Sequence, residues 1–357
     1  MRVLIVGGAG FVGSRLALRM KSDDTSLEVV VADNLKRRGA ELNLSLFQQA
    51  GISFIHADVR HASDLTDIPG NFDVMIDASA EPSVKAGLDG SPAYVLQTNL
   101  VGTIHCLEFA RFRVGRLIFL STSRVYAIEP MRHIALTETD TRFEIAADQG
   151  EPGISLAGFS EEFTTRQARS LYGASKLASE MLIQEYAHTY NLRAVINRCG
   201  VLAGPGQYGK VDQGVFTLWV ANHFFNKPLR YCGFGGEGKQ VRDLLHPDDL
   251  YSLIRSQLES RSESHWEGEV FNIGGGREVS VSLLEMTQLC QEIVGRSVPI
   301  ASDSTTSPVD IPLYLSDCRR AEHQFDWRPL KSARDIVSDI ASWLTENEAS
   351  LRPIFNL

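Results

Sequence analysis

Six short apolar runs rich in Val and Ile occur in the first two thirds of the chain, and a longer amphipathic stretch follows each of them. Parallel strands need crossover connections of that length, and strands covered on both faces are apolar along most of their length. The sequence therefore predicts an α/β fold, in which helices cover both faces of a doubly wound parallel sheet. The predicted strands are Arg2 to Val6, Leu27 to Ala32, Ser53 to Ala57, Phe72 to Asp77, Arg116 to Leu120 and Arg193 to Asn197.

The rest of the chain is less regular. A seventh strand-like run, Val270 to Ile273, can rejoin the same sheet, whereas residues 138–167 lack a steady period and predict a long excursion. Gly-rich and helical segments favour a smaller mixed C-terminal lobe, and they are Gly200 to Gly214, Tyr231 to Lys239, Ser282 to Val294 and Ala333 to Asn347. The expected boundaries are residues 1–197 with about 240–275 for the first domain, and about 198–239 with 276–357 for the lobe.

The charge and composition of the chain exclude several classes of function. Its 35 Lys and Arg residues stand against 44 Asp and Glu, a net charge of -9, which is the reverse of a surface that coats phosphates. No apolar run approaches the roughly 20 residues that span a bilayer, and no charged-then-apolar leader precedes the first strand. The 5 Cys residues stand singly, away from histidines at metal-ligand spacing. We expect a cytoplasmic protein with buried, reduced cysteines, no metal, and no nucleic-acid or membrane partner.

A glycine-rich turn joins the first predicted strand to a helical pattern from Ser14 to Met20. Residues Gly7 to Gly13 read Gly-Gly-Ala-Gly-Phe-Val-Gly, a G-x-x-G-x-x-G pattern. In such a turn Gly7 permits the bend, Gly10 lets the backbone approach a pyrophosphate, and Gly13 allows close packing of the helix, whose N-terminus offers free N–H donors. The turn predicts a dinucleotide site in a Rossmann-type sheet. A glycine-rich turn without a ligand is the alternative.

Acidic residues after the second and third predicted strands fit the same site. Asp33 follows Gly13 by twenty positions, where a carboxylate can bind ribose hydroxyls and would repel a 2′-phosphate. NAD is therefore the expected cofactor. NADP stays open as an alternative because three basic residues would offset that repulsion, namely Lys36, Arg37 and Arg38. Asp58 is placed either to hold the adenine edge or to cap a helix over His61 to Leu65.

A tyrosine and a lysine lie at helical spacing later in the chain. Tyr172 and Lys176 are four positions apart in a pattern that continues to Tyr190, so both side chains lie on one face. A nearby ammonium stabilises a phenolate and lowers the tyrosine pKa from roughly 10, so that Tyr172 would exchange protons with a substrate hydroxyl near neutral pH. The cluster Ser121-Thr122-Ser123 follows the fifth predicted strand, at the sheet edge where ligands bind in open α/β folds.

The order and spacing of these features resemble the extended short-chain dehydrogenase/reductase family over almost the whole chain. Within that family the chain is most similar to the nucleotide-sugar 2-epimerases. The strings that carry this resemblance are Asp33-Asn34-Leu35, Gly39-Ala40 with Asn43-Leu44, Thr137-Glu138-Thr139 with Thr141-Arg142, Asp212-Gln213-Gly214, Gly238 to His246, and Phe271-Asn272-Ile273-Gly274-Gly275.

The resemblance implies an NAD-dependent isomerase that epimerises a nucleotide-diphosphate sugar at C2 and assembles as a homodimer or homotetramer. It makes Tyr172 the base, Lys176 its pKa partner and a nicotinamide-ribose ligand, and Thr122 the hydroxyl that contacts the sugar. The implied cofactor-binding residues are Gly7, Gly10, Phe11, Val12, Gly13, Asp33, Asn34, Asp58, Val59, Ala78, Asn99, Tyr172 and Lys176. The implied substrate-binding residues are Glu81, Ser123, Gln207 and Arg242, the last of them through the substrate diphosphate.

The sequence also departs from the family pattern. Ser123 and Arg124 occupy the places of an Asp-Glu pair that runs the elimination in the 4,6-dehydratase branch, which disfavours dehydration. Glu81 replaces a neutral glutamine, and it either binds a hydroxyl or amino group of the sugar or is a solvated loop acid. Pro312 stands where that branch has an arginine that meets the nucleotide.

Other interpretations remain open at this stage. A nucleotide-sugar dehydrogenase or reductase, or a 4-epimerase of the same fold, would use the same residues. A non-catalytic sensor of the nicotinamide cofactor would keep the fold without the chemistry, but the intact catalytic residues argue against it. For Arg242 the alternative to diphosphate binding is an ion pair with Asp243 or Asp248.

Overall fold

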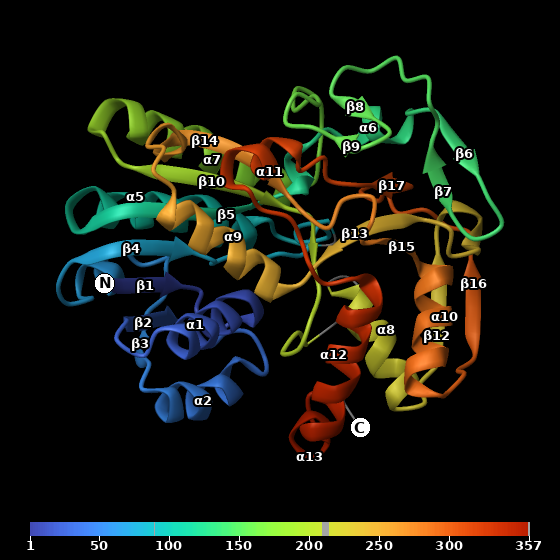
Figure 1. Ribbon diagram of the computed structural model, residues 1–357, viewed down its shortest axis with the longest axis horizontal. Coiled ribbons are helices and arrows are strands. Elements are labelled where there is room, and N and C mark those ends of the chain that lie inside the picture. The colour runs from blue at the N-terminus through green and yellow to red at the C-terminus, as the bar shows by residue number, and fades with distance from the viewer. Residues whose placement is uncertain (89, 209–213, 356–357) are drawn as a thin grey trace. The chain divides into compact units, whose positions relative to one another are not determined.

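The computed structural model describes residues 1–88, 90–208 and 214–355 (Figure 1). The chain forms two compact units. Unit 1 comprises Met1–Val125, Ser170–Arg198 and Tyr251–Phe271. Unit 2 comprises Tyr126–Arg169, Cys199–Leu250 and Asn272–Leu357.

Unit 1 is built on a seven-stranded sheet. Its strands are β1 (Arg2–Val6), β2 (Glu28–Asp33), β3 (Ser53–His56), β4 (Phe72–Asp77), β5 (Val114–Thr122), β10 (Ala194–Cys199) and β14 (Glu267–Ile273), in the order β14-β10-β5-β4-β1-β2-β3. β1 pairs with β2 and β4, β2 with β3, and β4 with β5, all in parallel. Successive side chains of β1, β2 and β4 are buried, which shows that both faces of the sheet are covered.

Helices cover this sheet and close its core. The helices of unit 1 are α1 (Phe11–Asp23), α2 (Asn43–Ala50), α3 (Ala62–Thr66), α4 (Ala93–Leu96), α5 (Gly102–Arg113), α7 (Leu171–Tyr190) and α9 (Pro247–Glu259), which joins the unit at Tyr251. Leu4, Met75, Phe119 and Ile183 are fully buried between sheet and helices. The buried apolar residues thus hold the helices of unit 1 against its sheet.

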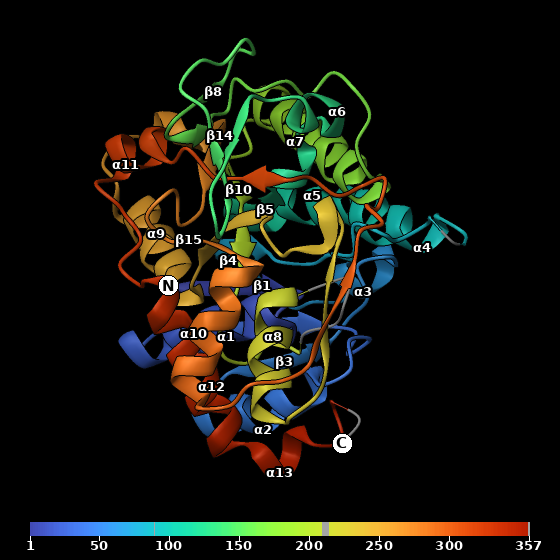
Figure 2. The ribbon, with the colours of Figure 1, turned by 90° about the vertical axis from the view of Figure 1, so that its right-hand side faces the viewer.

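Unit 2 is a mixed unit with shorter strands. Its strands are β6 (Leu136–Glu138), β7 (Phe143–Ile145), β8 (Ile154–Ser155), β9 (Gly158–Phe159), β11 (Val201–Leu202), β12 (Leu229–Cys232), β13 (Val241–Leu245), β15 (Ser280–Ser282), β16 (Ile300–Asp303) and β17 (Leu313–Tyr314). Its helices are α6 (Ile128–Arg132), α8 (Val215–Phe224), α10 (Leu283–Val294), α11 (Arg319–Phe325), α12 (Ala333–Glu346) and α13 (Glu348–Leu351). α8, α10 and α12 lie side by side (Figure 2), and Trp219, Met286 and Ile340 from these three helices share one core.

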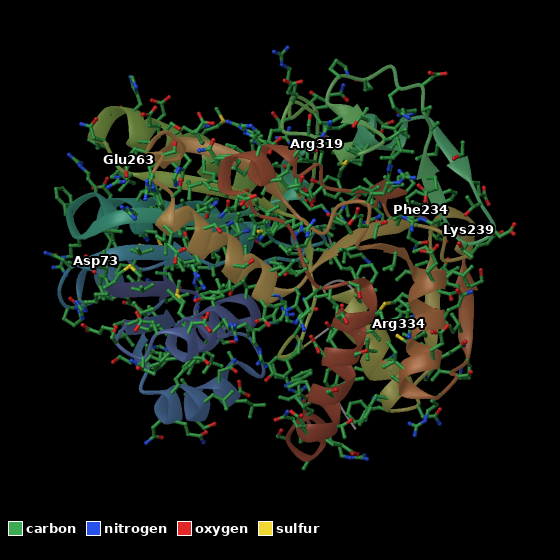
Figure 3. All side chains as sticks on the ribbon, viewed as in Figure 1. Asp73, Phe234, Lys239, Glu263, Arg319 and Arg334 are labelled. Carbon is green, nitrogen blue, oxygen red and sulfur yellow. The ribbon has the colours of Figure 1, made fainter. Side chains whose placement is uncertain are left out.

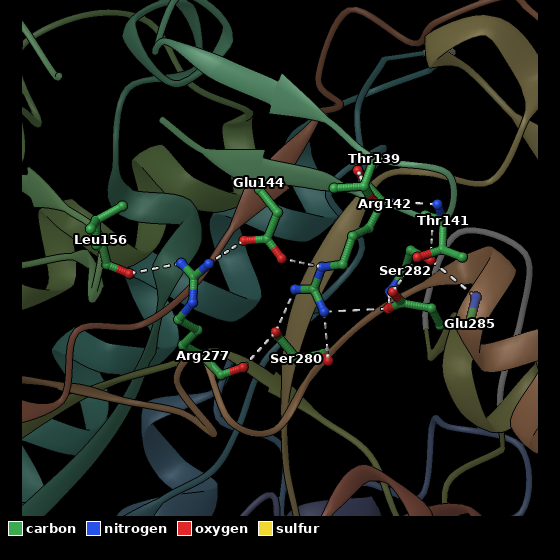
Figure 4. A network of polar contacts seen from close by, with 9 residues as sticks. All are labelled: Thr139, Thr141, Arg142, Glu144, Leu156, Arg277, Ser280, Ser282 and Glu285. Atoms are coloured by element: carbon green, nitrogen blue, oxygen red, sulfur yellow. Dashed lines mark hydrogen bonds and ion pairs between the residues drawn. The ribbon is translucent and has the colours of Figure 1, made fainter. Parts of the chain in front are cut away.

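The excursion expected over residues 138–167 forms two hairpins, β6–β7 and β8–β9. A polar network anchors the first hairpin to distant parts of unit 2 (Figure 4). Arg142 Nη1 lies 3.4 Å from Glu285 Oε2 at the start of α10, and Arg142 Nε lies 2.8 Å from Glu144 Oε1. Glu144 also pairs with Arg277 at 2.5 Å, so one carboxylate joins two guanidinium groups.

The unit boundaries differ from the expected domain boundaries. Residues 126–169, 240–250 and 272–275 belong to unit 2, although the expected first domain contained all three segments. Backbone pairing explains the difference, because Phe143 N donates to Lys239 O at 3.0 Å and Phe159 N donates to Leu315 O at 2.8 Å. Lys239, labelled in Figure 3, also places Nζ 2.7 Å from Glu138 Oε1. The excursion leaves the sheet of unit 1 and folds with the later part of the chain.

The fold class predicted from the apolar runs is confirmed, and the seventh run does join the sheet as β14. Four of the five cysteines are buried, but Cys232 is exposed, because it lies at the end of the short strand β12. Among the described residues, no group of three or more His, Cys, Asp or Glu side chains is arranged to hold a metal ion. In the same described residues, no helix is long and apolar enough to cross a membrane.

Candidate active site

The glycine turn between β1 and α1 has the geometry of a phosphate-binding loop. Gly7 has a φ of 70°, a left-handed conformation that favours glycine, and its N–H donates to Ala32 O at 2.9 Å. Gly10 is the N-cap of α1, and no side chain caps that helix. No acidic residue lies in its first turn, which contains Phe11 and Val12. The first N–H groups of α1 are therefore available to an anion.

The space around each glycine supports the same assignment. A Cβ on Gly7 would lie 2.6 Å from Ser79 Cα, next to Ala78, and a Cβ on Gly13 would lie 2.6 Å from Gly7 O. A Cβ on Gly10 would meet only Gly7 O, at 3.2 Å. Gly7 and Gly13 are thus needed for close packing of the backbone, whereas a Cβ on Gly10 would meet a single atom, and less closely. This is the division of roles that a dinucleotide cradle requires, so the residues present fit NAD.

Asp33 connects the end of β2 to this turn. Its Oδ2 accepts from Ala9 N at 3.0 Å and its Oδ1 accepts from Leu35 N at 2.7 Å. Burial raises the pKa of Asp33, and these backbone donors oppose that rise. Gly10 N–H is a third backbone donor to this carboxylate, and a carboxylate has about four acceptor positions, so about one remains for a ribose hydroxyl. Asp33 therefore orders the glycine turn as well as presenting a charge at the expected position.

Asp58 lies beside the same edge, and its contacts exclude one of the two expected roles. Arg60 Nη2 pairs with its Oδ2 at 2.6 Å, and Asn34 Nδ2 donates to that oxygen at 3.0 Å. The Arg60 guanidinium holds the pKa of Asp58 well below its usual range. The N-cap of α3 is His61, so the expectation that Asp58 caps this helix is wrong. The cause is that its side chain is occupied by Arg60 and Asn34.

Tyr172 and Lys176 lie in the first two turns of α7. Ser170 caps the helix by accepting from Gly173 N at 3.1 Å, which fixes where the helix begins. Tyr172 is 8% exposed and Lys176 only 1%. Lys176 Nζ lies 3.8 Å from the centre of the Phe119 ring on β5, a cation–π contact that places the ammonium against the sheet. The expected pair on one helix face is therefore present and largely desolvated.

The three hydroxyl residues after Leu120 face different partners. Ser121 Oγ donates to Glu180 Oε1 of α7 at 2.5 Å, within the core. Thr122 Oγ1 accepts from Arg124 N at 3.2 Å, so its O–H hydrogen can still be donated to a substrate oxygen. Ser123 begins a 3-10 turn, Ser123–Val125, and is buried. Thr122 at the carboxyl end of β5 thus keeps a hydrogen to donate, and its contact with the sugar stays a prediction.

A buried asparagine links the loop after β4 to α7. Asn99 lies in the π-helical turn Gln97–Val101, accepts from Glu81 N at 2.7 Å and donates to Ser175 Oγ at 3.2 Å. Glu81 Oε1 accepts from Ser83 N at 3.2 Å, and Val59 O contacts His105 Nδ1 at 2.7 Å. Asn99 therefore positions backbone around the site. Cofactor contacts of Asn99 and Val59 and the sugar contact of Glu81 stay predictions.

The other two expected substrate residues belong to unit 2. Arg242 lies on β13, and its Nη2 donates to Asp310 Oδ1 at 2.9 Å and to Ile311 O at 2.7 Å. The alternative that paired Arg242 with Asp243 or Asp248 is therefore wrong, because the acid that pairs with Arg242 is Asp310. Gln207 accepts from Thr217 and donates to Leu202 O, so its side chain is held within the unit. The substrate contacts of both residues stay predictions.

Two charged residues near the site were not anticipated from the sequence. Glu180 and Arg198 form a buried ion pair at 2.7 Å, and Glu180 lies one helical turn beyond Lys176. The sequence did contain a sign of this pair, because Glu180 follows Lys176 by four positions on the same face of a mostly apolar helix.

Two residues of the strings that carry the family resemblance, Asp212 and Gln213, lie outside the described residues.

Comparison with known proteins places the chain in a family. The model of the NAD dependent epimerase/dehydratase family matches residues 3–274. The chain belongs to this family. Its cofactor is accordingly NAD, as Asp33 predicted, and its glycine turn and the Tyr172–Lys176 pair lie within the matched residues.

Relatives of this family member include both epimerases and dehydratases. A CDP-paratose 2-epimerase from Salmonella typhi is 30% identical, over 96% of this chain and 99% of the relative. A dTDP-glucose 4,6-dehydratase from Salmonella typhimurium is 28% identical, over 97% of this chain and 93% of the relative. The structure of a dTDP-glucose 4,6-dehydratase double mutant from Streptomyces venezuelae, solved with NAD, has a TM-score of 0.78 and 26% identity, and covers 99% of this chain and 100% of that one.

Proposed function

We propose that this protein epimerises a nucleotide-diphosphate sugar at C2, by transient oxidation to a keto sugar. One arrangement carries the proposal: Thr122 at the carboxyl end of β5, beside the helix that bears Tyr172 and Lys176. An elimination needs an acid–base pair next to the threonine, and this chain has Ser123 and Arg124 there. The similarity to a CDP-paratose 2-epimerase supports the same choice over dehydration.

The residues of unit 1 supply the proton chemistry of this reaction. Bound NAD would supply hydride transfer, from the sugar carbon and back to its opposite face. Tyr172 Oη, as the phenolate, would take the proton of the hydroxyl on the same carbon, so that the C–H and O–H bonds of that carbon break while its C=O bond forms. The Lys176 ammonium stabilises the phenolate, and Thr122 donates a hydrogen bond to the sugar oxygen. When the ketone is reduced, Tyr172 gives the same proton back.

Four residues are proposed to bind the substrate. Arg242 would add its positive charge to the binding of the diphosphate, while its Nη2 stays bonded to Asp310 and Ile311. Glu81, Ser123 and Gln207 are proposed to contact the sugar. A nucleotide-sugar dehydrogenase or 4-epimerase would use the same site, and the experiment below separates them.

The proposed reaction predicts an enzyme that carries its cofactor and recycles it. Mass spectrometry of material released by heating the purified protein should show NAD in nearly equimolar amount. Incubation with CDP-, UDP-, GDP-, dTDP- and ADP-sugars in deuterated water should then give a 2-epimer without deuterium at C2, because the hydride returns internally. Stoichiometric accumulation of NADH would instead establish a dehydrogenase, a 4-epimer would establish the 4-epimerase, and solvent deuterium at C2 would refute hydride return.

We further propose that the protein is a homodimer or homotetramer in the cytoplasm. Large apolar side chains are exposed on the neighbouring helices α5 and α7, including Phe112 at 70% and Met181 at 60%. Such a patch on one face favours a second copy as its partner. Replacing Phe112 and Met181 with Glu should reduce the mass measured by light scattering, from a dimer to one chain or from a tetramer to a smaller assembly, since the charges would be desolvated in the interface. Leu330→Glu, at a residue 76% exposed in unit 2, is the matched control, and an unchanged mass for the double variant would refute this interface.

A further inference from the structure

A buried cluster of three polar residues lies behind the candidate catalytic groups of unit 1. Arg198 Nε donates to both carboxylate oxygens of Glu180 at 3.1 Å, and Nη2 donates to Oε2 at 2.7 Å. Ser121 Oγ donates to Glu180 Oε1 at 2.5 Å. Glu180 is 2% exposed, Ser121 5% and Arg198 7%. The cluster therefore joins α7, β5 and β10 at one point in the core.

Stability alone is a poor explanation for this cluster. Removing two charges from water costs about as much free energy as their attraction returns, and apolar residues of similar volume often serve as well. The positions of the three residues point to another role. Glu180 lies one helical turn beyond Lys176 and two beyond Tyr172, and Ser121 directly precedes Thr122. The hydrogen bonds thus connect the helix that carries the base to the strand that carries the substrate hydroxyl.

We propose that Glu180 and Arg198 are positioning residues for the reaction. They fix α7 against the carboxyl end of β5, so that Tyr172 and Lys176 meet the same substrate atom as Thr122. The opposite charges of Glu180 and Arg198 also cancel each other, so the pair changes the electrostatic potential at Tyr172 much less than the Lys176 ammonium does. This inference rests on the proposed role of Tyr172 as the base, but not on the identity of the sugar.

Other titratable groups lie near Lys176, which is on the same helix as Glu180. Cys106 of α5 interacts electrostatically with both Lys176 and Asp77 of β4. Burial raises the pKa of Cys106 well above its ordinary value, so the thiol stays neutral near neutral pH. Asp77 is 1% exposed and accepts from Ser79 Oγ at 2.6 Å. These groups are unchanged in the variants below and form a constant background.

Removing one charge of the pair should shift the pKa of Tyr172 in a direction set by the charge that remains. Glu180→Gln leaves the Arg198 cation, which stabilises the phenolate and lowers that pKa. Arg198→Met leaves the Glu180 carboxylate, which raises it. Glu180 lies eight positions after Tyr172 on α7, which is about 12 Å along the helix axis. A unit charge at that distance changes a pKa by roughly one unit at an effective dielectric constant of about 20.

The test is a titration of the Tyr172 phenolate by its ultraviolet absorbance in the NAD-loaded protein. Each variant is compared with the same variant carrying Tyr172→Phe, so that the other tyrosines cancel. We expect opposite shifts for Glu180→Gln and Arg198→Met, and values within about 0.3 unit of the wild type for the double variant and for Ser121→Ala. Shifts of the same sign, or no shift, would overturn the electrostatic part of the proposal.

Kinetics test the positioning part, and they do so even if the single-charge variants fail to fold. The neutral double variant should retain NAD and the normal pKa of Tyr172, yet lose about tenfold in kcat with little change in KM, because a misplaced base affects the transition state more than binding. An unchanged kcat would overturn the positioning role. Absence of turnover with every nucleotide sugar in the wild type would refute the proposed function instead, since the absorbance titration needs no substrate.

Discussion

Tyr172→Phe is expected to lower kcat by about 10³-fold while the protein keeps its bound NAD. The substitution removes only the phenol oxygen, the atom proposed to take and return the sugar proton. The ring stays in its largely buried place on α7, and the glycine turn and Asp33, which are proposed to hold the cofactor, lie on other elements. Turnover of the identified nucleotide sugar and mass spectrometry of the released cofactor measure the two effects separately.

Tyr190→Phe is the matched control, because Tyr190 ends the same helix, is 43% exposed and packs on Tyr186. It should leave kcat and bound NAD unchanged. If Tyr172→Phe retained more than about a tenth of the wild-type kcat, Tyr172 would not be the base, because a positioned general base contributes at least 10²-fold. Loss of NAD from the Tyr172 variant would show that the phenol also supports the cofactor site.

The central sheet could be predicted because its strands are buried on both faces. Arg2–Val6 and Phe72–Asp77 match the predicted runs at both ends, since nearly every position in them is apolar and buried. β5 extends two residues beyond the predicted end at Leu120, because Ser121 and Thr122 are polar and interrupt the apolar pattern. Their partners come from within the fold, and a local pattern cannot show that.

The short strands of unit 2 lacked any such signal. β6 to β9 are two or three residues long, so no periodicity can develop in them. Arg142 is bound to Glu285, far along the chain, and their contact holds the hairpin in place. Interactions over such separations also explain the error for Arg242, whose nearest acids in sequence were considered but whose partner is Asp310.

The candidate site was predictable where one element carries the pattern, as for Tyr172 and Lys176 on α7. The sequence did not show that adjacent hydroxyls on β5 have different roles, although side chains alternate between the faces of a strand. Ser121 turns to the buried carboxylate of Glu180, whereas Thr122 keeps a hydrogen to donate. The pairing of Glu180 with Arg198 needed the fold, because α7 and β10 meet only through tertiary packing.

Gly13→Val is expected to leave a folded protein with less than about a tenth of the wild-type NAD. A Cβ at this position would lie 2.6 Å from both Gly7 O and Gly8 Cα, and these are backbone atoms that cannot rotate away. The turn must therefore open, and overpacking of this kind costs about 1–3 kcal/mol, which a chain of this size can tolerate. The measurements are thermal unfolding and the amount of NAD released by heat.

The control for Gly13→Val is Gly150→Ala, since nothing lies within 4 Å of a Cβ built at Gly150. This variant should keep both its melting temperature and its NAD. Val at position 13 adds apolar groups without changing charge, so a selective loss of NAD can arise only from the shape of the turn. If the Gly13 variant kept a full complement of NAD, the backbone of Gly7 to Gly13 would not be the pyrophosphate cradle, and the alternative of a glycine-rich turn without a ligand would hold.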